Sequence, residues 1–252
     1  MGANVAEMMA SISTARDESI PQLAERLVHK LRNPLSVITV AASQLDVSAG
    51  ELLAKDDLAF IRDIIVASEN MESILTRFLW YANPPRPQFN DFDLNEICRN
   101  QAAEYNQKYS DDSGAEGKVR FLPGSVSINV TCDRQMMQIV ISELLENALR
   151  STKGKPGQMI TVRTDRSENS ACIIIDDTGD GINESSISSL FLPFITQRPG
   201  ATGLGLSISE RLVSLHGGKI SLTARPEGGA RVTVIIPKTQ ETIGHAVNLD
   251  CR

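Results

Sequence analysis

The chain has 252 residues, of which 41% are hydrophobic, so it is long enough for two modest domains with buried cores. Its formal net charge is −6 and its sequence pI is near 5.2, which disfavours a surface that binds nucleic-acid phosphates. The sequence contains no apolar run long enough for a membrane span, and its four cysteines form no CxxC pair. Together these features favour a cytoplasmic protein in a reducing compartment.

The first part of the chain predicts a helical hairpin after a polar lead. Residues 1–19 are polar and irregular and are expected to fray. Residues 20–82 carry apolar side chains in steps of four and three, which is typical of packed helices. A turn is expected over residues 46–54. The first apolar seam consists of Ala24, Val28, Leu31, Leu35, Ile38, Ala42 and Leu45, and the second of Ile61, Ile64, Ser68, Met71, Leu75 and Phe78.

Two helices alone bury little surface, so this hairpin predicts a homodimer in which four helices form a bundle. His29 follows the seam residue Val28 and is expected to point outward. A lone surface histidine is usually a solvated bystander. Here, however, Pro34 removes the hydrogen bond to the Lys30 carbonyl and is expected to bend the helix beside the imidazole. His29 is therefore a candidate functional residue.

The second part of the chain predicts an α+β domain. Prolines make residues 83–91 a stiff linker, residues 92–238 form the domain, and residues 239–252 are a polar tail. Helices are expected over 94–109 and after a helix-capping Asp133. The expected strands, at 92–94, 119–122, 126–130, 158–164, 171–175, 220–224 and 232–236, predict a mixed sheet covered by helices on one face.

The helix after Asp133 places three polar side chains on one face. Glu143, Asn147 and Arg150 recur at spacings of four and three residues. Such a face is most often simply solvated. An asparagine carbonyl, however, suits the coordination of Mg²⁺, and an arginine neutralises phosphate oxygens.

The stretch from Ile173 to Ile208 carries two glycine motifs. A short apolar strand leads to Asp177 and a turn with Gly179 and Gly181, where backbone approaches a ligand closely. A second motif, Gly203-Leu204-Gly205, opens a helical pattern whose first N–H groups can meet an anion. A lone glycine pair usually marks an ordinary turn. The order differs from a Rossmann motif, and Leu206 stands where a Walker loop needs lysine.

This segment resembles the adenine-binding turn, mobile lid and second glycine motif of the histidine-kinase ATPase domain. Glu143-Leu-Leu-Glu-Asn147-Ala-Leu-Arg150 is similar to the asparagine motif of that family, and LFLPF, with Phe191 and Phe194, resembles its phenylalanine motif. His29-Lys-Leu-Arg-Asn33-Pro34-Leu35 resembles its phosphoacceptor box. Over about residues 20–237 the chain is thus similar to the sensor histidine kinases of two-component systems.

The resemblance implies ATP and Mg²⁺ as cofactors and a response-regulator receiver domain as partner, whose aspartate accepts the phosphoryl group. It makes His29 the phosphoacceptor and gives Asn33 a role in dephosphorylating the partner. Asp177 would accept a hydrogen bond from the adenine amino group, Asn147 would hold magnesium, and Arg150 would take the place of a phosphate-contacting lysine. The remaining nucleotide-binding residues that it implies are Gly179, Gly181, Arg198, Thr202, Gly203, Leu204 and Gly205.

One position departs from the family pattern. Family members carry Glu or Asp after the histidine, and this chain has Lys30, which cannot accept the imidazole proton. Glu25, one helical turn before His29, is a candidate substitute base, which predicts slow or phosphatase-biased activity. Two alternatives stay open. One is a degenerate kinase serving as a dimeric scaffold or phosphotransfer adaptor. The other is a plain ATPase in which Glu143 activates water or contacts the metal.

Overall fold

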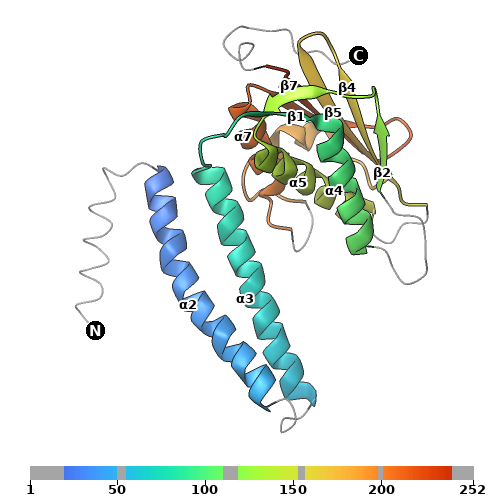
Figure 1. The fold of residues 1–252 in the computed structure, drawn as a ribbon. Coiled ribbons are helices and arrows are strands. Elements are labelled where there is room, and N and C mark those ends of the chain that lie inside the picture. Colours follow the sequence, from blue (N-terminus) through green and yellow to red (C-terminus); the bar gives the residue numbers. More distant parts are fainter. Residues whose placement is uncertain (1–19, 50–54, 110–118, 153–156, 198–200, 240–252) are drawn as a thin grey trace. The chain divides into compact units, whose positions relative to one another are not determined.

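The computed structural model describes residues 20–49, 55–109, 119–152, 157–197 and 201–239. The chain divides into two compact units between Pro85 and Arg86, inside the predicted linker. The overall class is α+β, as predicted, with a helical first unit and a sheet-containing second unit (Figure 1). The predicted lead, all of the predicted tail except Thr239, and Arg198 lie outside the described residues.

The first unit is a pair of long helices. Helix α2 spans Ile20–Ala49 and α3 spans Lys55–Ala82, and the two pack side by side (Figure 1). Helix α2 continues through Pro34. It also extends past Asp46, where the turn was expected to begin, because the Asp46 carboxylate lies 3.4 Å from Nε of Arg62 on α3 and belongs to the packed pair.

The apolar seam of α2 divides into two stripes. Ala24, Val28, Leu35 and Ala42 are each at most 6% exposed and form the buried stripe. The prediction of a single packed seam is wrong for Leu31, Ile38 and Leu45, which are 46–52% exposed. These three repeat every seven residues and run beside the buried stripe, because a helix turns by about 100° per residue. One helix partner cannot cover both stripes.

The second unit is built on a five-stranded mixed sheet in the order β2-β4-β5-β7-β6. Strand β2 pairs parallel to β4, and the other neighbours are antiparallel. The sheet therefore has the mixed character that the sequence predicted. Its strands are β2 (Val119–Pro123), β4 (Ile160–Arg166), β5 (Ser170–Asp177), β6 (Lys219–Ala224) and β7 (Ala230–Pro237).

Two short strands form a separate antiparallel sheet: β1 (Asn90–Asp93) and β3 (Asn129–Cys132). The sequence placed the second of these strands at residues 126–130, which is wrong at its start. Val126 is 99% exposed, and the main-chain N–H of Ile128 donates to the side chain of Asp93 at 3.0 Å and not to a main-chain oxygen.

Three helices cover one face of the larger sheet, as predicted (Figure 1). They are α4 (Leu94–Tyr109), α5 (Arg134–Thr152) and α7 (Gly205–Leu215). Asp133 caps α5 as expected, because its Oδ1 accepts from the Met136 N–H at 3.0 Å. The fully buried side chains between helices and sheet include Ile97, Met137, Leu144, Ile160, Ile173 and Ile208.

Shorter elements lie between β5 and α7: a 3₁₀ turn, η1 (Glu184–Ser186), and one helical turn, α6 (Ile187–Leu190). Among the described residues no helix combines the length and the apolar character needed to cross a membrane.

Candidate nucleotide site

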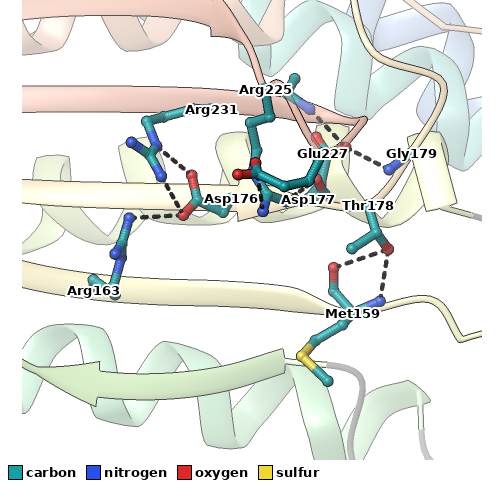
Figure 2. Close-up of polar contacts among 10 residues, drawn as sticks. Met159, Arg163, Asp176, Asp177, Thr178, Gly179, Arg225, Glu227 and Arg231 are labelled. Carbon is teal, nitrogen blue, oxygen red and sulfur yellow. Dashed lines mark hydrogen bonds and ion pairs between the residues drawn. The ribbon is translucent and has the colours of Figure 1, made fainter.

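The site begins at Asp177, the last residue of β5, whose side chain is 7% exposed. Its Oδ1 accepts from the N–H of Gly179 at 2.8 Å (Figure 2). The same oxygen accepts from the N–H of Ala230 at 3.2 Å. Neither contact uses Oδ2, which accepts no hydrogen bond from the described residues. The carboxylate is thus fixed through one oxygen, and the other makes no hydrogen bond with the described residues.

Ala230 is the first residue of β7 and directly follows the turn that joins β6 and β7, residues 225–229. Arg225 in this turn donates from Nη1 to the main-chain oxygen of Asp177 at 2.8 Å (Figure 2). Sequence reasoning missed this support, because strand patterns alone do not show that a hairpin fifty residues later returns to Asp177. The only sequence signal was the pair Gly228-Gly229, whose φ angles of 91° and 85° suit glycine.

Strand β5 is held on both sides next to the site. The carboxylate of Asp176 accepts from Arg163 on β4 at 2.8 Å and from Arg231 on β7 at 2.6 Å (Figure 2). The hydrogen bond to Asp176 raises the pKa of Arg231 above its ordinary value. These bidentate and bridging contacts fix the end of β5 across three strands.

The glycine turn after Asp177 is seated against α5. A Cβ added to Gly179 would lie 2.7 Å from the Ser151 main-chain oxygen, so only glycine fits there. Gly181 has a φ of 74°, and its backbone lies against that of Gly229. Because α5 also packs against α7, the predicted site segments belong to neighbouring elements.

Helix α5 carries the predicted polar face. Glu143 and Asn147 are half-buried, and the Arg150 side chain is 45% exposed. Sequence reasoning missed Glu146 beside them. Its Oε1 accepts from the hydroxyl of Tyr109 at 3.0 Å, and its Oε2 lies 3.8 Å from Nε of Arg150. Burial raises the pKa of the neighbouring Tyr105, so the phenol stays protonated as a donor.

The second glycine motif opens α7. Leu204 and Gly205 are buried, and no side chain caps the first turn of the helix, so its N–H groups can serve an anion. Gly203 has a φ of 67°, and its carbonyl accepts from the N–H of Phe194 at 2.9 Å. Phe194 itself has a φ of 64° and is 56% exposed. The hydrogen bond between Phe194 and Gly203 joins the phenylalanine motif to the second glycine motif. Thr202, which precedes Gly203, is half-buried.

The predicted phosphoacceptor region lies on α2, in the other unit. His29 is exposed, as the sequence predicted, and so are Asn33, Glu25 and Lys30. Glu25 and His29 are four residues apart on one helix, a spacing that places them on the same face.

Comparisons with known proteins agree with this geometry. Residues 132–240 match the family described as histidine kinase-, DNA gyrase B- and HSP90-like ATPase. The signal transduction histidine-protein kinase AtoS of Escherichia coli (strain K12) is 27% identical over 225 residues, which are 87% of this chain and 35% of AtoS. The nitrogen regulation protein NtrY of Azorhizobium caulinodans is 26% identical over 244 residues, 92% of this chain and 31% of NtrY. The chain thus spans about a third of the length of these relatives.

Solved structures of histidine kinases also resemble this chain. The histidine kinase ThkA, in its crystal structure with the response regulator protein TrrA, matches with a TM-score of 0.62 and 25% identity, covering 87% of this chain and 62% of that one. Full-length ShkA in complex with AMPPNP matches with a TM-score of 0.74 over 87% of this chain and 46% of that one; its 17% identity supports the fold alone.

The fold and site therefore define a helical hairpin joined to an ATPase domain of the histidine-kinase type. Over most of its length the chain is similar to sensor histidine kinases.

Proposed function

We propose that this chain transfers the γ-phosphoryl group of ATP to His29 and then to an aspartate of a response-regulator receiver domain. The observation that carries the proposal is the Asp177 carboxylate, which is fixed through Oδ1 and open at Oδ2. An open carboxylate oxygen at the end of a buried strand accepts a hydrogen bond from an exocyclic amino group such as that of adenine. Turn glycines let the base approach the backbone.

The phosphates would lie toward α5 and α7. The uncapped first turn of α7 supplies N–H donors, and Arg150 supplies a positive charge. The described residues contain no cluster of three or more His, Cys, Asp or Glu side chains that would hold a metal ion by itself. Such a chain suits Mg²⁺ that is bound mainly by phosphate and water oxygens, with Asn147 as the protein ligand. Glu143 on the same face is a second candidate ligand. When bound, Mg²⁺ neutralises charge on the phosphates.

His29 would act as the nucleophile. A neutral ring nitrogen forms the bond to phosphorus while the bond between phosphorus and the ADP oxygen breaks, and the other ring nitrogen keeps its proton. Positive charge then develops on the ring and needs a nearby carboxylate. Lys30 cannot supply one, so Glu25 takes this role in the proposal. The substitution is expected to make autophosphorylation slow, and Asn33 would orient the water that dephosphorylates the partner.

The hairpin is proposed to form a homodimer. Exposed apolar side chains on α2 and α3, among them Leu31 at 49%, Ile38 at 46% and Ile64 at 47%, provide the surface that a second copy would cover. The receiver domain is proposed by likeness to ThkA, which was crystallised with the response regulator TrrA. An ATP-dependent exchange with such a partner would take place in the cytoplasm.

Labelling with γ-³²P-ATP and magnesium tests the proposal. Acid-labile, alkali-stable label is expected on the wild-type protein and absent from His29→Ala, with His216→Gln, outside the proposed phosphoacceptor region, as a comparison. Lys30 favours a second candidate, a nucleotide-binding scaffold without kinase activity. Bound ATP without any label would support that scaffold, and released phosphate without label would support an ATPase that uses Glu143.

A further inference from the structure

The turn between β6 and β7 supports the end of β5 from outside the glycine motifs. We propose that Arg225 in this turn is a positioning residue that sets the preference of the site for an adenine base. This inference rests on the proposed function and adds a specificity determinant to it.

Three contacts seat the turn on Asp177. Arg225 donates from Nη1 to the Asp177 main-chain oxygen at 2.8 Å, and its side chain is only 19% exposed. The N–H of Ala230 donates to Oδ1 of Asp177 at 3.2 Å. A Cβ on Gly229 would lie 2.7 Å from the Asp177 carbonyl carbon, so the two backbones are in close contact. The main chain of Asp177 is therefore held by the turn, and its carboxylate by Ala230, the first residue of β7, directly after the turn.

The turn also has its own hydrogen bonds. The N–H of Arg225 donates to the Gly229 oxygen at 3.2 Å, and the N–H of Gly228 donates to the Arg225 oxygen at 3.0 Å. Glu227 lies 3.7 Å from the Arg225 guanidinium but is 73% exposed, so this ion pair adds little. The strong contact of the Arg225 side chain is the one to Asp177.

This placement has a consequence for base selection. An adenine amino group donates to Oδ2 of Asp177, whereas guanine presents a carbonyl oxygen at the corresponding ring position, which a carboxylate repels. Discrimination between the two bases depends on where Oδ2 lies, and Arg225 fixes the backbone that carries it. Loss of the guanidinium leaves the Asp177 carbonyl without this charged donor and lets the carboxylate shift. ATP then loses a hydrogen bond that GTP does not make.

The test compares variants of the whole chain by calorimetric titration with Mg-ATP and Mg-GTP. Arg225→Met keeps the length of the side chain and removes its donors. Arg225→Lys keeps a cation and a donor. The matched control is Arg211→Met, which changes an exposed arginine on α7 whose guanidinium makes no hydrogen bond or ion pair with the described residues.

We expect Arg225→Met to raise the Kd for ATP about tenfold. The Kd for GTP should change far less, so the ratio of the two constants falls by nearly the same factor, and Arg225→Lys should recover part of it. In a labelling assay the same loss should appear in KM, with kcat little changed.

Equal weakening for both nucleotides would reduce Arg225 to a general structural role and overturn the inference, as would a Met variant that behaves like Arg211→Met. If Arg225→Met does not fold, the Lys variant decides, because its shorter side chain should weaken ATP binding more than GTP binding, and an equal weakening of both overturns the inference. A wild-type chain that takes up no ATP would instead refute the proposed function itself.

Discussion

Lys30 stands directly after His29, and both side chains are exposed on α2. An ammonium group on the residue next to His29 opposes the positive charge that phosphorylation builds on the imidazole. We expect Lys30→Glu to speed phosphorylation of His29 at least about tenfold, because a positioned carboxylate replaces the opposing charge. Glu25→Gln should slow it further. The initial rate of γ-³²P incorporation measures both effects.

The matched control for Glu25→Gln is Glu69→Gln, which removes an exposed carboxylate from α3 instead. Its rate should equal that of the wild type. Identical rates in the Lys30, Glu25 and wild-type proteins would refute the idea that Glu25 replaces the missing acid.

Gly179 makes a second prediction at this scale. In Gly179→Ala the new methyl group would lie 2.7 Å from the Ser151 main-chain oxygen, so the turn must move away from α5. We expect a loss of about 1–3 kcal/mol in the free energy of unfolding. The Kd for ATP should rise at least about tenfold, because the displaced turn carries Asp177. Urea denaturation and calorimetry measure the two quantities.

Gly157→Ala is the control for that variant. Unlike Gly179, Gly157 has a positive φ, of 69°, and no atom of the described residues lies within 4 Å of a Cβ added to it. Gly157→Ala should lower the free energy of unfolding by about 1 kcal/mol, because of backbone strain, and leave ATP binding unchanged. Similar ATP affinities in the two variants would show that the contact with Ser151 does not shape the site.

The candidate site residues that the sequence predicted stand in local motifs, whereas those it missed depend on contacts between distant parts of the chain. Asp177, Gly179 and Gly203 stand in short motifs whose spacing is visible along the chain, so they could be predicted. Arg225 and Ala230 act on Asp177 across about fifty residues, and no local pattern shows that contact. Glu146 was missed because a charged residue on a helix normally faces solvent, and its hydrogen bond from Tyr109 depends on the packing of α4 on α5.

At the scale of elements, the exposed stripe of α2 predicts the oligomeric state. Leu31 and Ile38 are about half exposed, seven residues apart, and lie beside the stripe that packs on α3. We expect Leu31→Gln combined with Ile38→Gln to convert a dimer into a monomer, because the polar side chains oppose burial of this stripe. Sedimentation equilibrium over a range of micromolar concentrations measures the change.

Val37→Gln is the control, because Val37 is 69% exposed and lies on a different face of the same helix. This variant should remain a dimer. A wild-type protein that sediments as a monomer at these concentrations would contradict the four-helix bundle altogether.

The junction of α5 and α7 predicts how stability depends on pH. His216, which ends α7, is 2% exposed; its Nδ1 donates to the Leu212 oxygen at 2.8 Å, and its Nε2 accepts from the N–H of Asp133 at 3.0 Å. Burial lowers its pKa below the ordinary 6.5 in the folded protein. As the pH falls below about 6.5, the unfolded chain binds a proton that the folded chain does not. Stability therefore falls with acid, by at most about 1.4 kcal/mol per pH unit from this group.

His216→Gln removes the contribution of this buried histidine to the pH dependence of stability. The difference in unfolding free energy between wild type and His216→Gln should shrink from pH 7.5 to pH 5.5, as measured by urea denaturation. His29→Gln, at an exposed position, is the control. A difference for His216→Gln that stays constant over this range would show that the buried ring does not resist protonation.

Elements with strong periodicity were predicted best. Helix α4 begins and ends at the predicted residues, Leu94 and Tyr109, because its buried residues repeat at helical spacing. The separate sheet of β1 and β3 was not foreseen, since strands of four residues carry little periodic signal and their pairing is long-range. The division of the α2 seam was missed because an apolar pattern does not tell which of two partners each side chain meets.

At the scale of the whole molecule, the division between Pro85 and Arg86 predicts where the second unit can be cut. Beyond the division, Gln88 donates its N–H to Oδ2 of Asp133 at 2.7 Å, and the ring of Phe89 packs edge-on to His216 at 5.2 Å. Both residues lie inside the segment that the sequence assigned to the linker, yet they contact the cap of α5 and the end of α7.

A fragment of residues 86–239 keeps these contacts, whereas a fragment of residues 92–239, cut at the boundary that the sequence suggested, loses them together with half of β1. We expect the longer fragment to bind ATP as the full chain does, and the shorter one to be less stable by about 2 kcal/mol, since the part-buried hydrogen bond from Gln88 to Asp133, half of the β1–β3 pairing and an aromatic contact disappear. Neither fragment contains His29, so neither should label itself, but the longer one should label an added fragment of residues 20–85 slowly, because the two units must then meet by diffusion. Urea denaturation, calorimetry and γ-³²P transfer measure these three effects. Equal stability of the two fragments would place the true boundary after Asp91 and make Gln88 and Phe89 part of the linker after all.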